Sequence, residues 1–186
     1  MRQVVLLSGG IDSLVCAELA RKAGDLAGCV FVDYGHPAQV PEGWKAFAYC
    51  GSREVPLKVV HCFGLNLGDM GTSSGARVVP HRNAVLLSVA ANQVAAMGGK
   101  ALTIGANRDD EAEYEDCRIH FINGLSGLLK VPISIPLLGK TKSAVIATAR
   151  ALGLTQGDAW SCYGGGPQPC KVCPSCEQAD SAWGSP

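Results

Sequence analysis

Short apolar runs alternate with helical segments along this chain, and that alternation constrains the fold more than any other feature. The strand candidates are residues 4–7, 29–32, 55–60, 101–104 and 133–135. Apolar residues recur at helical spacing between and after them, over residues 11–22, 41–49, 82–97, 119–129 and 141–152. Strands that alternate with helices predict an α/β fold with a doubly wound, mostly parallel five-stranded sheet, covered by helices on both faces.

Composition limits the domain count and the class of partner. With 186 residues, 47% of them hydrophobic, the chain can bury one substantial core. Sixteen basic and 16 acidic residues cancel, which favours a small-molecule substrate over a nucleic acid. The N-terminal apolar run is too short for a signal peptide or a membrane span, so we expect a cytoplasmic protein. We expect residues 1–155 to form the α/β domain and residues 156–186 a tail packed on it.

Polar clusters follow the predicted strand ends and indicate where a ligand binds. They occupy residues 8–13, 33–36 and 105–118. In open parallel sheets, ligands bind beyond the carboxyl ends of the strands. Residues 69–76 are rich in Gly, Ser and Thr without periodicity and are predicted to form a loop.

The segment Ser8-Gly9-Gly10-Ile11-Asp12-Ser13 joins the first strand to the first helix and favours phosphate binding. Backbone N–H groups and the positive end of a helix converge there, and glycines let an anion approach. The two hydroxyls can donate, while Asp12 can cap the helix or help to hold magnesium. An ordinary glycine turn with a capping side chain is the alternative. Gly139-Lys140-Thr141 is not a P-loop, because Ser134 stands where the motif requires glycine.

Four of the nine cysteines lie close together, at Cys162, Cys170, Cys173 and Cys176. Four thiolates at this spacing can surround one tetrahedral ion without leaving a position for substrate, which predicts a structural zinc. A redox-active cysteine pair and an iron–sulfur cluster are the competing interpretations. The other five cysteines are scattered and are expected to be buried and unreactive.

The glycine segment resembles the pyrophosphatase loop of enzymes that split ATP into AMP and pyrophosphate. Eight landmarks extend this likeness in order along nearly the whole chain, and together they resemble the 7-cyano-7-deazaguanine synthase family. They are residues 8–13, 33–35, 79–83, 105–107, 114–118, Lys142, 160–163 and the cysteine tail. The resemblance implies an adenine nucleotide alpha hydrolase-like fold and an ATP-dependent ligase that forms a carbon–nitrogen bond in queuosine biosynthesis.

Members of that family convert 7-carboxy-7-deazaguanine and ammonia into the nitrile through an adenylated acid and an adenylated amide. The resemblance therefore implies a deazapurine acid, ATP with Mg²⁺ and ammonia as ligands, and a homodimer without nucleic acid or membrane. The implied nucleotide contacts are Leu7, Ser8, Gly9, Gly10, Ile11, Asp12, Ser13, Asp33, Tyr34, Gly35 and Gly105. The implied catalytic residues are Asp12, Ser13, Arg82 and Lys142, and the implied substrate contacts are Arg82, Asn83, Asn107, Asp116 and Arg118.

Several positions depart from the family pattern and leave other functions open. The region 36–60 is short, His36 replaces another polar residue, His81 replaces a glycine, and Glu115 replaces a proline. One alternative is a trimmed enzyme that stops at 7-amido-7-deazaguanine or amidates a related acid. A tRNA-thiolation enzyme would need an RNA surface, against the neutral charge, and a reactive cysteine such as Cys117. A non-catalytic zinc-binding module is the third class.

Overall fold

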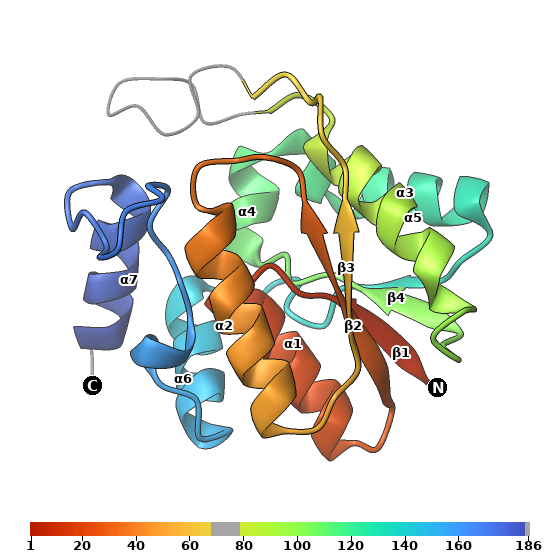
Figure 1. The fold of residues 1–186 in the computed structure, drawn as a ribbon, viewed down its shortest axis with the longest axis horizontal. Coiled ribbons are helices and arrows are strands. Elements are labelled where there is room, and N and C mark those ends of the chain that lie inside the picture. The colour runs from red at the N-terminus through yellow and green to blue at the C-terminus, as the bar shows by residue number, and fades with distance from the viewer. Residues whose placement is uncertain (68–78, 185–186) are drawn as a thin grey trace.

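The computed structural model describes residues 1–67 and 79–184, and the loop predicted at residues 69–76 lies outside this range. Five strands form one sheet in the order β3-β2-β1-β4-β5, and all neighbours are parallel (Figure 1). The strands are β1 (Gln3–Leu6), β2 (Leu26–Asp33), β3 (Leu57–His61), β4 (Ala101–Thr103) and β5 (Ile133–Ser134). The predicted five-stranded parallel sheet is confirmed.

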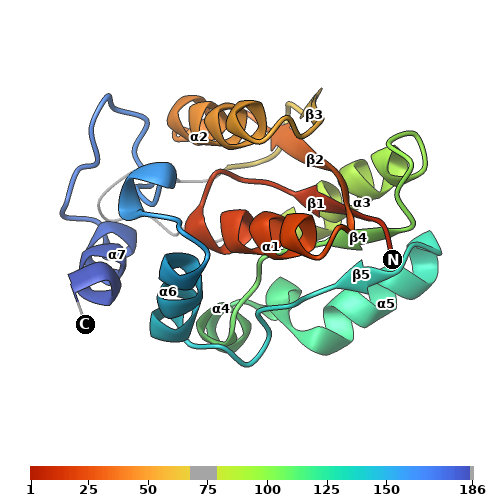
Figure 2. The same ribbon diagram turned by 90° about the horizontal axis from the view of Figure 1, so that it is seen from below.

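Helices cover both faces of the sheet (Figure 2). They are α1 (Ile11–Lys22), α2 (Gln39–Ser52), α3 (Arg82–Val94), α4 (Arg108–Glu113), α5 (Ile119–Leu129), α6 (Lys142–Ala151) and α7 (Pro174–Gly184). Two short 3-10 turns, Glu115–Cys117 and Gln156–Asp158, complete the described part of the chain. Among these residues, none of the helices is long and apolar enough to cross a bilayer.

Alternate residues of the strands pack into two separate apolar cores, one on each face of the sheet. The sheet therefore needs a layer of helices on each side. Val5 and Leu7 are buried with residues of α1, α2 and α6, whereas Val4 and Leu6 are buried with residues of α3 and α5. A parallel strand buried on both faces reads as a continuous apolar run. The run of residues 4–7 is therefore explained by its central place in the sheet.

Two helices were not expected from the sequence. The first, α4, is polar but has a capping box at its start. The Asn107 side chain accepts hydrogen bonds from the N–H groups of Asp109 and Asp110, and the Asp110 carboxylate accepts one from the Asn107 N–H. The second, α7, begins at Pro174 inside the cysteine tail. Both lack the continuous apolar periodicity that identifies the longer helices.

The strand order reverses between β1 and β4. The chain passes from β1 through β2 to β3 on one side and then crosses to β4 and β5 on the other. At such a switch point the connections leave in opposite directions, and a crevice opens beyond the carboxyl ends of the two strands. The ends of β1 and β4 are followed by the glycine segment and by Gly105, so a ligand is expected to bind in this crevice.

The cysteine tail packs on the same body as the sheet. Ala182 is buried in the core with α1 and α6, and Trp183 packs against that core. Arg150 donates to the carbonyl of Trp183, and Gln156 donates to Asp180 at 2.7 Å. These contacts join α7 to α6 and to the preceding turn, while the division of the chain into residues 1–155 and 156–186 stays a prediction.

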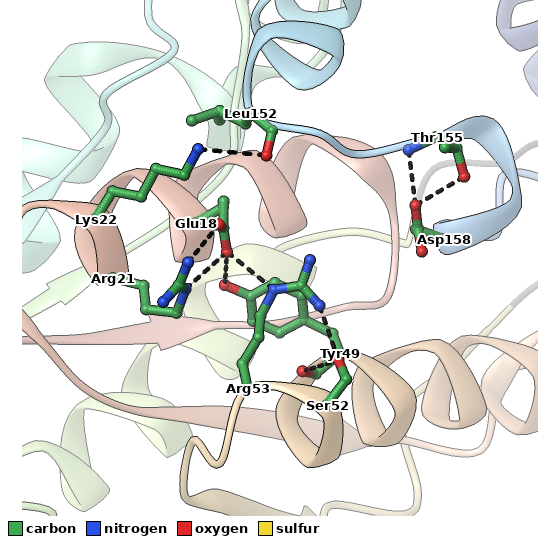
Figure 3. A network of polar contacts seen from close by, with 9 residues as sticks. All are labelled: Glu18, Arg21, Lys22, Tyr49, Ser52, Arg53, Leu152, Thr155 and Asp158. Carbon is green, nitrogen blue, oxygen red and sulfur yellow. Dashed lines mark hydrogen bonds and ion pairs between the residues drawn. The ribbon is translucent and has the colours of Figure 1, made fainter.

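A buried carboxylate joins α1 to the end of α2 (Figure 3). Glu18 accepts two hydrogen bonds from Arg21, at 3.0 and 2.8 Å, and one each from the Tyr49 hydroxyl and Arg53, both at 3.0 Å. The Arg21 guanidinium holds the pKa of Glu18 down at about 2, with Tyr49 and Arg53 acting in the same direction against the effect of burial. Glu18 therefore stays charged at neutral pH.

Replacing Glu18 with glutamine is expected to lower the free energy of unfolding by about 2 kcal/mol at pH 7, because charge-assisted hydrogen bonds are lost. The native pKa lies below the value of about 4.3 for a glutamate in an unfolded chain, so the contribution is complete above pH 4.3. It disappears as the pH falls through about 2. Urea unfolding at pH 7, 5, 4 and 3 measures the difference, with the exposed Glu54→Gln as control. A deficit independent of pH would contradict the assignment.

Candidate active site

A pocket of about 260 Å³ opens at the switch point of the sheet. The end of β1 contributes Leu6, Leu7 and Ser8, and the end of β4 contributes Ile104, Gly105 and Ala106. The other lining residues are Gly10, Asp12, Ser13, Phe31, Val32, Tyr34, Glu42, Arg82, Asn83, Leu86, Asp110, Tyr114, Cys117 and Tyr163. The pocket thus brings together segments from both halves of the sheet, α3, α4 and the cysteine tail.

Internal hydrogen bonds fix the shape of the glycine segment. The Ser13 hydroxyl donates to the carbonyl of Gly10 at 2.8 Å and accepts from the Ser8 N–H at 3.2 Å. Gly10 is the N-cap of α1, and no side chain caps it. Gly10, Asp12 and Ser13 also line the pocket, so an uncapped helix start, which can bind an anion, lies at its wall.

Gly9 and Gly105 have no room for a side chain. Gly9 has a φ of +78°, and an added Cβ would lie 2.2 Å from the carbonyl oxygen of Glu42. At Gly105, an added Cβ would lie 2.7 Å from the carbonyl carbon of Asp12 and from the N atom of Ser13. Both glycines allow close backbone packing around the first turn of α1.

Asp12 is held by residues far away in the sequence. Its Oδ1 accepts from the Asn107 side chain at 3.0 Å, and its Oδ2 forms an ion pair with Lys142 at the start of α6. The Lys142 N–H in turn donates to Asp109 at 2.9 Å. Since both oxygens of Asp12 are engaged, we do not assign it as a metal ligand. The arrangement fixes the Lys142 ammonium beside the glycine segment.

Arg82 and Tyr34 supply a cation and a hydroxyl on the other side of the pocket. Burial alone would lower the pKa of Arg82, but Tyr34 and Asp116 raise it. Burial raises the pKa of Tyr34, and a hydrogen bond with Arg82 opposes this shift. Arg82 is therefore a permanent positive charge, suited to a phosphate or carboxylate group.

The start of α3 is anchored by Asp116. Its carboxylate accepts from the Asn83 N–H at 2.9 Å, and the Asn83 amide donates to the Asp116 carbonyl at 3.3 Å. His81 precedes α3 with a φ of +57°, a conformation that explains why a glycine would suit this position. The Asp116 carboxylate thus positions Asn83, which lines the pocket.

The predicted site residues divide into two groups. Those that line the pocket are Leu7, Ser8, Gly10, Asp12, Ser13, Tyr34, Arg82, Asn83 and Gly105. The others are Gly9, Ile11, Asp33, Gly35, Asn107, Asp116, Arg118 and Lys142, which are not among the lining residues. Asp33 pairs with His61 at 3.1 Å, and Arg118 forms a surface ion pair with Glu115. The roles of Asp33 and Arg118 in binding stay predictions.

Several lining residues had no role in the sequence interpretation. Glu42 faces the buried His36 at 3.2 Å, and His36 stacks on Tyr34 with ring centroids 4.4 Å apart. Asp110 lies in α4, where burial, reinforced by the charge of Asp12, raises its pKa to about 6. The capping pattern of Asn107 and Asp110 was the available signal for α4, but it gives no indication that Asp110 reaches a ligand.

Four cysteine sulfurs form a compact cluster beside this pocket. The Sγ atoms of Cys162, Cys170, Cys173 and Cys176 all lie within 4.8 Å of one another. Cys162 Sγ accepts from the N–H groups of Gly164 at 3.2 Å and Cys170 at 3.3 Å. Tetrahedral zinc with Zn–S bonds of about 2.3 Å needs sulfurs about 3.8 Å apart, so this donor set fits a tetrathiolate metal site.

The tail and the glycine segment share a main-chain contact. The Trp160 N–H donates to the carbonyl of Gly9 at 3.0 Å, and the Trp160 indole donates to the carbonyl of Cys162 at 2.8 Å. At Gly165, an added Cβ would lie 1.9 Å from the carbonyl oxygen of Pro37, just before α2. The segment that carries the cysteine cluster is therefore packed against the glycine segment and the residues just before α2.

Comparison with known proteins gives a consistent result. The family described as "Queuosine biosynthesis protein QueC" matches residues 2–185. The 7-cyano-7-deazaguanine synthase of Synechococcus sp. (strain CC9902) is 31% identical, over 96% of this chain and 91% of the relative. The enzyme of the same name from Novosphingobium aromaticivorans is 34% identical, over 93% and 85%.

Among solved structures, the fold resembles the U34-tRNA thiolase NcsA from Methanococcus maripaludis with its [4Fe-4S] cluster. The TM-score is 0.61, with 18% sequence identity, and the match covers 97% of this chain and 64% of the thiolase chain. At that identity the likeness supports the fold alone.

Proposed function

Because this chain belongs to the QueC family of queuosine biosynthesis proteins, we propose that it converts 7-carboxy-7-deazaguanine and ammonia into 7-cyano-7-deazaguanine with ATP. The chain is an ATP-dependent ligase-type enzyme, like the relatives that it matches. One observation carries the proposal: the glycine segment, Arg82 and Asn83 line a single pocket at the switch point. An anion site and a substrate site that adjoin in this way suit the attack of a carboxylate on ATP.

The glycine segment would hold the phosphates of ATP. The N–H groups at the start of α1 and the hydroxyls of Ser8 and Ser13 offer donors, and the helix dipole favours negative charge there. Lys142, held by Asp12, would neutralise charge that develops on the departing pyrophosphate. Mg²⁺ would arrive on the nucleotide phosphates, whose charge it offsets when bound.

Arg82 would orient the substrate carboxylate. A guanidinium can donate two parallel hydrogen bonds to a carboxylate, and the neighbouring Tyr34 and Asp116 raise the pKa of Arg82 and so keep it cationic. Adenylation converts the carboxylate oxygen into a good leaving group, so ammonia can displace AMP to give the amide. A second adenylation, on the amide oxygen, would let that oxygen leave with AMP while the nitrogen gives up its remaining protons, which yields the nitrile. Orientation and charge neutralisation are what this pocket can supply.

We propose zinc as the ion of the cysteine cluster, held by Cys162, Cys170, Cys173 and Cys176. The close sulfurs and the two N–H donors to Cys162 support a tetrathiolate site. The pKa of the Cys170 thiol is lowered to about 6, which favours the thiolate. The largest cause is a hydrogen bond from the backbone N–H of Val172, followed by one from the Cys162 thiol. A zinc with four cysteine ligands would have a structural role.

Product analysis tests the proposed reaction. With 7-carboxy-7-deazaguanine, ATP and ammonium, mass spectrometry is expected to detect the nitrile together with AMP and pyrophosphate. Accumulation of the amide without nitrile would instead support the trimmed enzyme. If the acid fails to stimulate pyrophosphate release from the metal-loaded protein, the proposed function is wrong.

Lys142→Met is the matched variant for this assay. It is expected to reduce the rate of pyrophosphate release about 100-fold, because a preorganised cation beside the phosphates is lost. Lys140→Met removes an exposed ammonium two residues earlier and is expected to retain the wild-type rate. Equal rates for wild type and Lys142→Met would contradict the role of Lys142 while leaving the reaction itself in place.

The thiolation alternative requires a reactive cysteine at the site. Cys117 lines the pocket, but it is buried, and that burial raises the pKa of its thiol to about 12. A thiol with this pKa is almost entirely protonated at neutral pH and is a poor nucleophile. The observation supports amidation over sulfur transfer.

For the assembly, we propose a homodimer. Val40, Trp44 and Phe47 lie on one face of α2 and are 59, 70 and 55% exposed. Large apolar side chains that recur at helical spacing on a surface are typical of contacts between proteins. This face supports pairing with a second copy of the chain, while the net charge of zero gives no support for nucleic acid as a partner.

A further inference from the structure

Asp110 lines the pocket, and its carboxylate is only partly engaged in hydrogen bonding. Its Oδ2 accepts from the Asn107 N–H at 3.1 Å as part of the capping box of α4. Among the side chains that the structure describes, this is the one hydrogen bond that the Asp110 carboxylate accepts, and it uses Oδ2 rather than Oδ1. Asp110 lines the same pocket as Gly10, Asp12 and Ser13. A half-buried carboxylate therefore shares the pocket with the glycine segment, where the phosphates of ATP would be held under the proposed function.

Asp12 and Asp110 are not equivalent, although both line the pocket. The two oxygens of Asp12 are engaged by Asn107 and Lys142. Asn107 also donates its backbone N–H to Asp110, so this one residue holds both carboxylates in place. Only Asp110 keeps an oxygen that can accept a proton without breaking an ion pair.

The surroundings of Asp110 set its basicity. Burial raises its pKa to about 6, the charges of Asp12 on α1 and Asp109 on α4 act in the same direction, and Lys142 on α6 opposes them. Cys117, in the 3-10 turn, also faces it and is protonated. Asp110 is thus charged at pH 7, yet it is a stronger base than an exposed aspartate, which has a pKa of about 3.9.

Amide formation requires a base, because ammonia exists mainly as ammonium at neutral pH and ammonium has no lone pair for attack. Resting on the proposed function, we propose that Asp110 is the catalytic base that takes a proton from ammonium as the carbon–nitrogen bond forms. The negative charge of Asp110 in the pocket also favours binding of the cation. The base lies beside the glycine segment, where the adenylated acid would be held.

In the proposed step, ammonium gives one proton to Asp110 and its nitrogen replaces AMP on the acyl carbon. An N–H bond of ammonium breaks, its proton moves to Asp110 Oδ1, and the freed lone pair forms a bond with the carbonyl carbon of the acyl adenylate. The bond from that carbon to the phosphate oxygen then breaks, and its electron pair leaves with AMP. A second proton passes from the nitrogen to solvent, which gives the neutral amide. Asp110 releases its own proton to water afterwards.

Asp110→Asn separates this role from nucleotide binding. Asparagine still offers an oxygen to the Asn107 N–H, so the start of α4 is expected to remain intact. ATP–pyrophosphate exchange, measured with the acid and without ammonium, is expected to stay within about 3-fold of wild type. Amide formation with ammonium is expected to fall about 10²- to 10⁴-fold, the usual contribution of a general base. The rate of amide formation by the wild type should rise with pH through a pKa near 6, and this pH dependence should disappear in Asp110→Asn.

Hydroxylamine as the nucleophile distinguishes a catalytic base from a residue that only maintains the shape of the pocket. It is largely neutral at pH 7, so it can attack the acyl adenylate without first giving a proton to a base. Hydroxamate formation by Asp110→Asn is therefore expected to approach the wild-type rate, although amide formation does not. Glu111→Gln, on the same helix but outside the pocket lining, is the control and should match wild type with both nucleophiles.

Three results would overturn the assignment. Loss of exchange together with amidation would mean that Asp110 acts on the nucleotide. Wild-type amidation by Asp110→Asn would mean that no base is needed there. An equal loss with hydroxylamine would point to a distorted pocket. Absence of exchange in the wild-type enzyme would instead refute the proposed function, and the assignment of Asp110 with it.

Discussion

Gly9→Ala is expected to lower the kcat/KM of adenylation about 100-fold. The residue has a φ of +78°, and the new Cβ would lie 2.2 Å from the carbonyl oxygen of Glu42, so the glycine segment or the start of α2 must move. A displacement of about 1 Å in a positioning group can cost about 100-fold in rate. ATP–pyrophosphate exchange measures the loss, and urea unfolding is expected to show about 2 kcal/mol of destabilisation.

Gly24→Ala is the matched control. Gly24 has a similar φ of +73°, but an added Cβ there would meet nothing within 4 Å. This variant has only the conformational cost of a left-handed alanine, about 1 kcal/mol, and should keep wild-type kinetics. If the two variants behave alike, the steric contact with Glu42 does not determine the shape of the glycine segment.

Removal of the metal is expected to unfold the cysteine tail and to lower the midpoint of thermal unfolding by about 10 °C. Metal binding supplies folding free energy where a segment has little apolar sequence, and a few kcal/mol corresponds to this shift in a chain of this size. Cys176→Ser should reproduce the effect of a strong chelator, because Cys176 is buried in α7 within the cluster. Calorimetry and elemental analysis, with one zinc per chain expected, provide the measurements.

Cys62→Ser is the control for that experiment, since Cys62 lies at the end of β3 and outside the cluster. It should change neither the metal content nor the unfolding midpoint. Iron and sulfide in place of zinc, with visible absorption, would identify an iron–sulfur cluster. A purified protein without metal but with full stability would contradict the proposed structural role.

The local part of the fold was readable from the sequence. The run of residues 4–7, the glycine segment and α1 follow one another along the chain, so periodicity and turn chemistry identified them. The cysteine spacing likewise brought four sulfurs to one place, as the structure confirms. In both cases the residues that act together are neighbours in sequence, and short-range rules are sufficient.

The long-range part was not readable from the residues alone. Asp12 meets Asn107 and Lys142 only because β4 and α6 pack beside β1 and α1, and no local pattern encodes the strand order. Family resemblance supplied Lys142 without its partner. Asp110 was missed because it stands between two other acidic residues, Asp109 and Glu111, so a capping residue and a pocket residue look the same in the sequence.

The main-chain hydrogen bond from Trp160 to Gly9 joins the segment of the metal-binding cysteines to the glycine segment, which lies far away in sequence. Tyr163, only one residue beyond Cys162, also lines the pocket. Disorder of the cysteine cluster would therefore remove Tyr163 from the pocket lining. It would also break the hydrogen bond from Trp160 to the glycine segment, even with the sheet intact. Under the proposed function, formation of the nitrile in a cell would then depend on the supply of the metal, and metal starvation would leave an inactive enzyme that keeps its sheet but not its ordered tail.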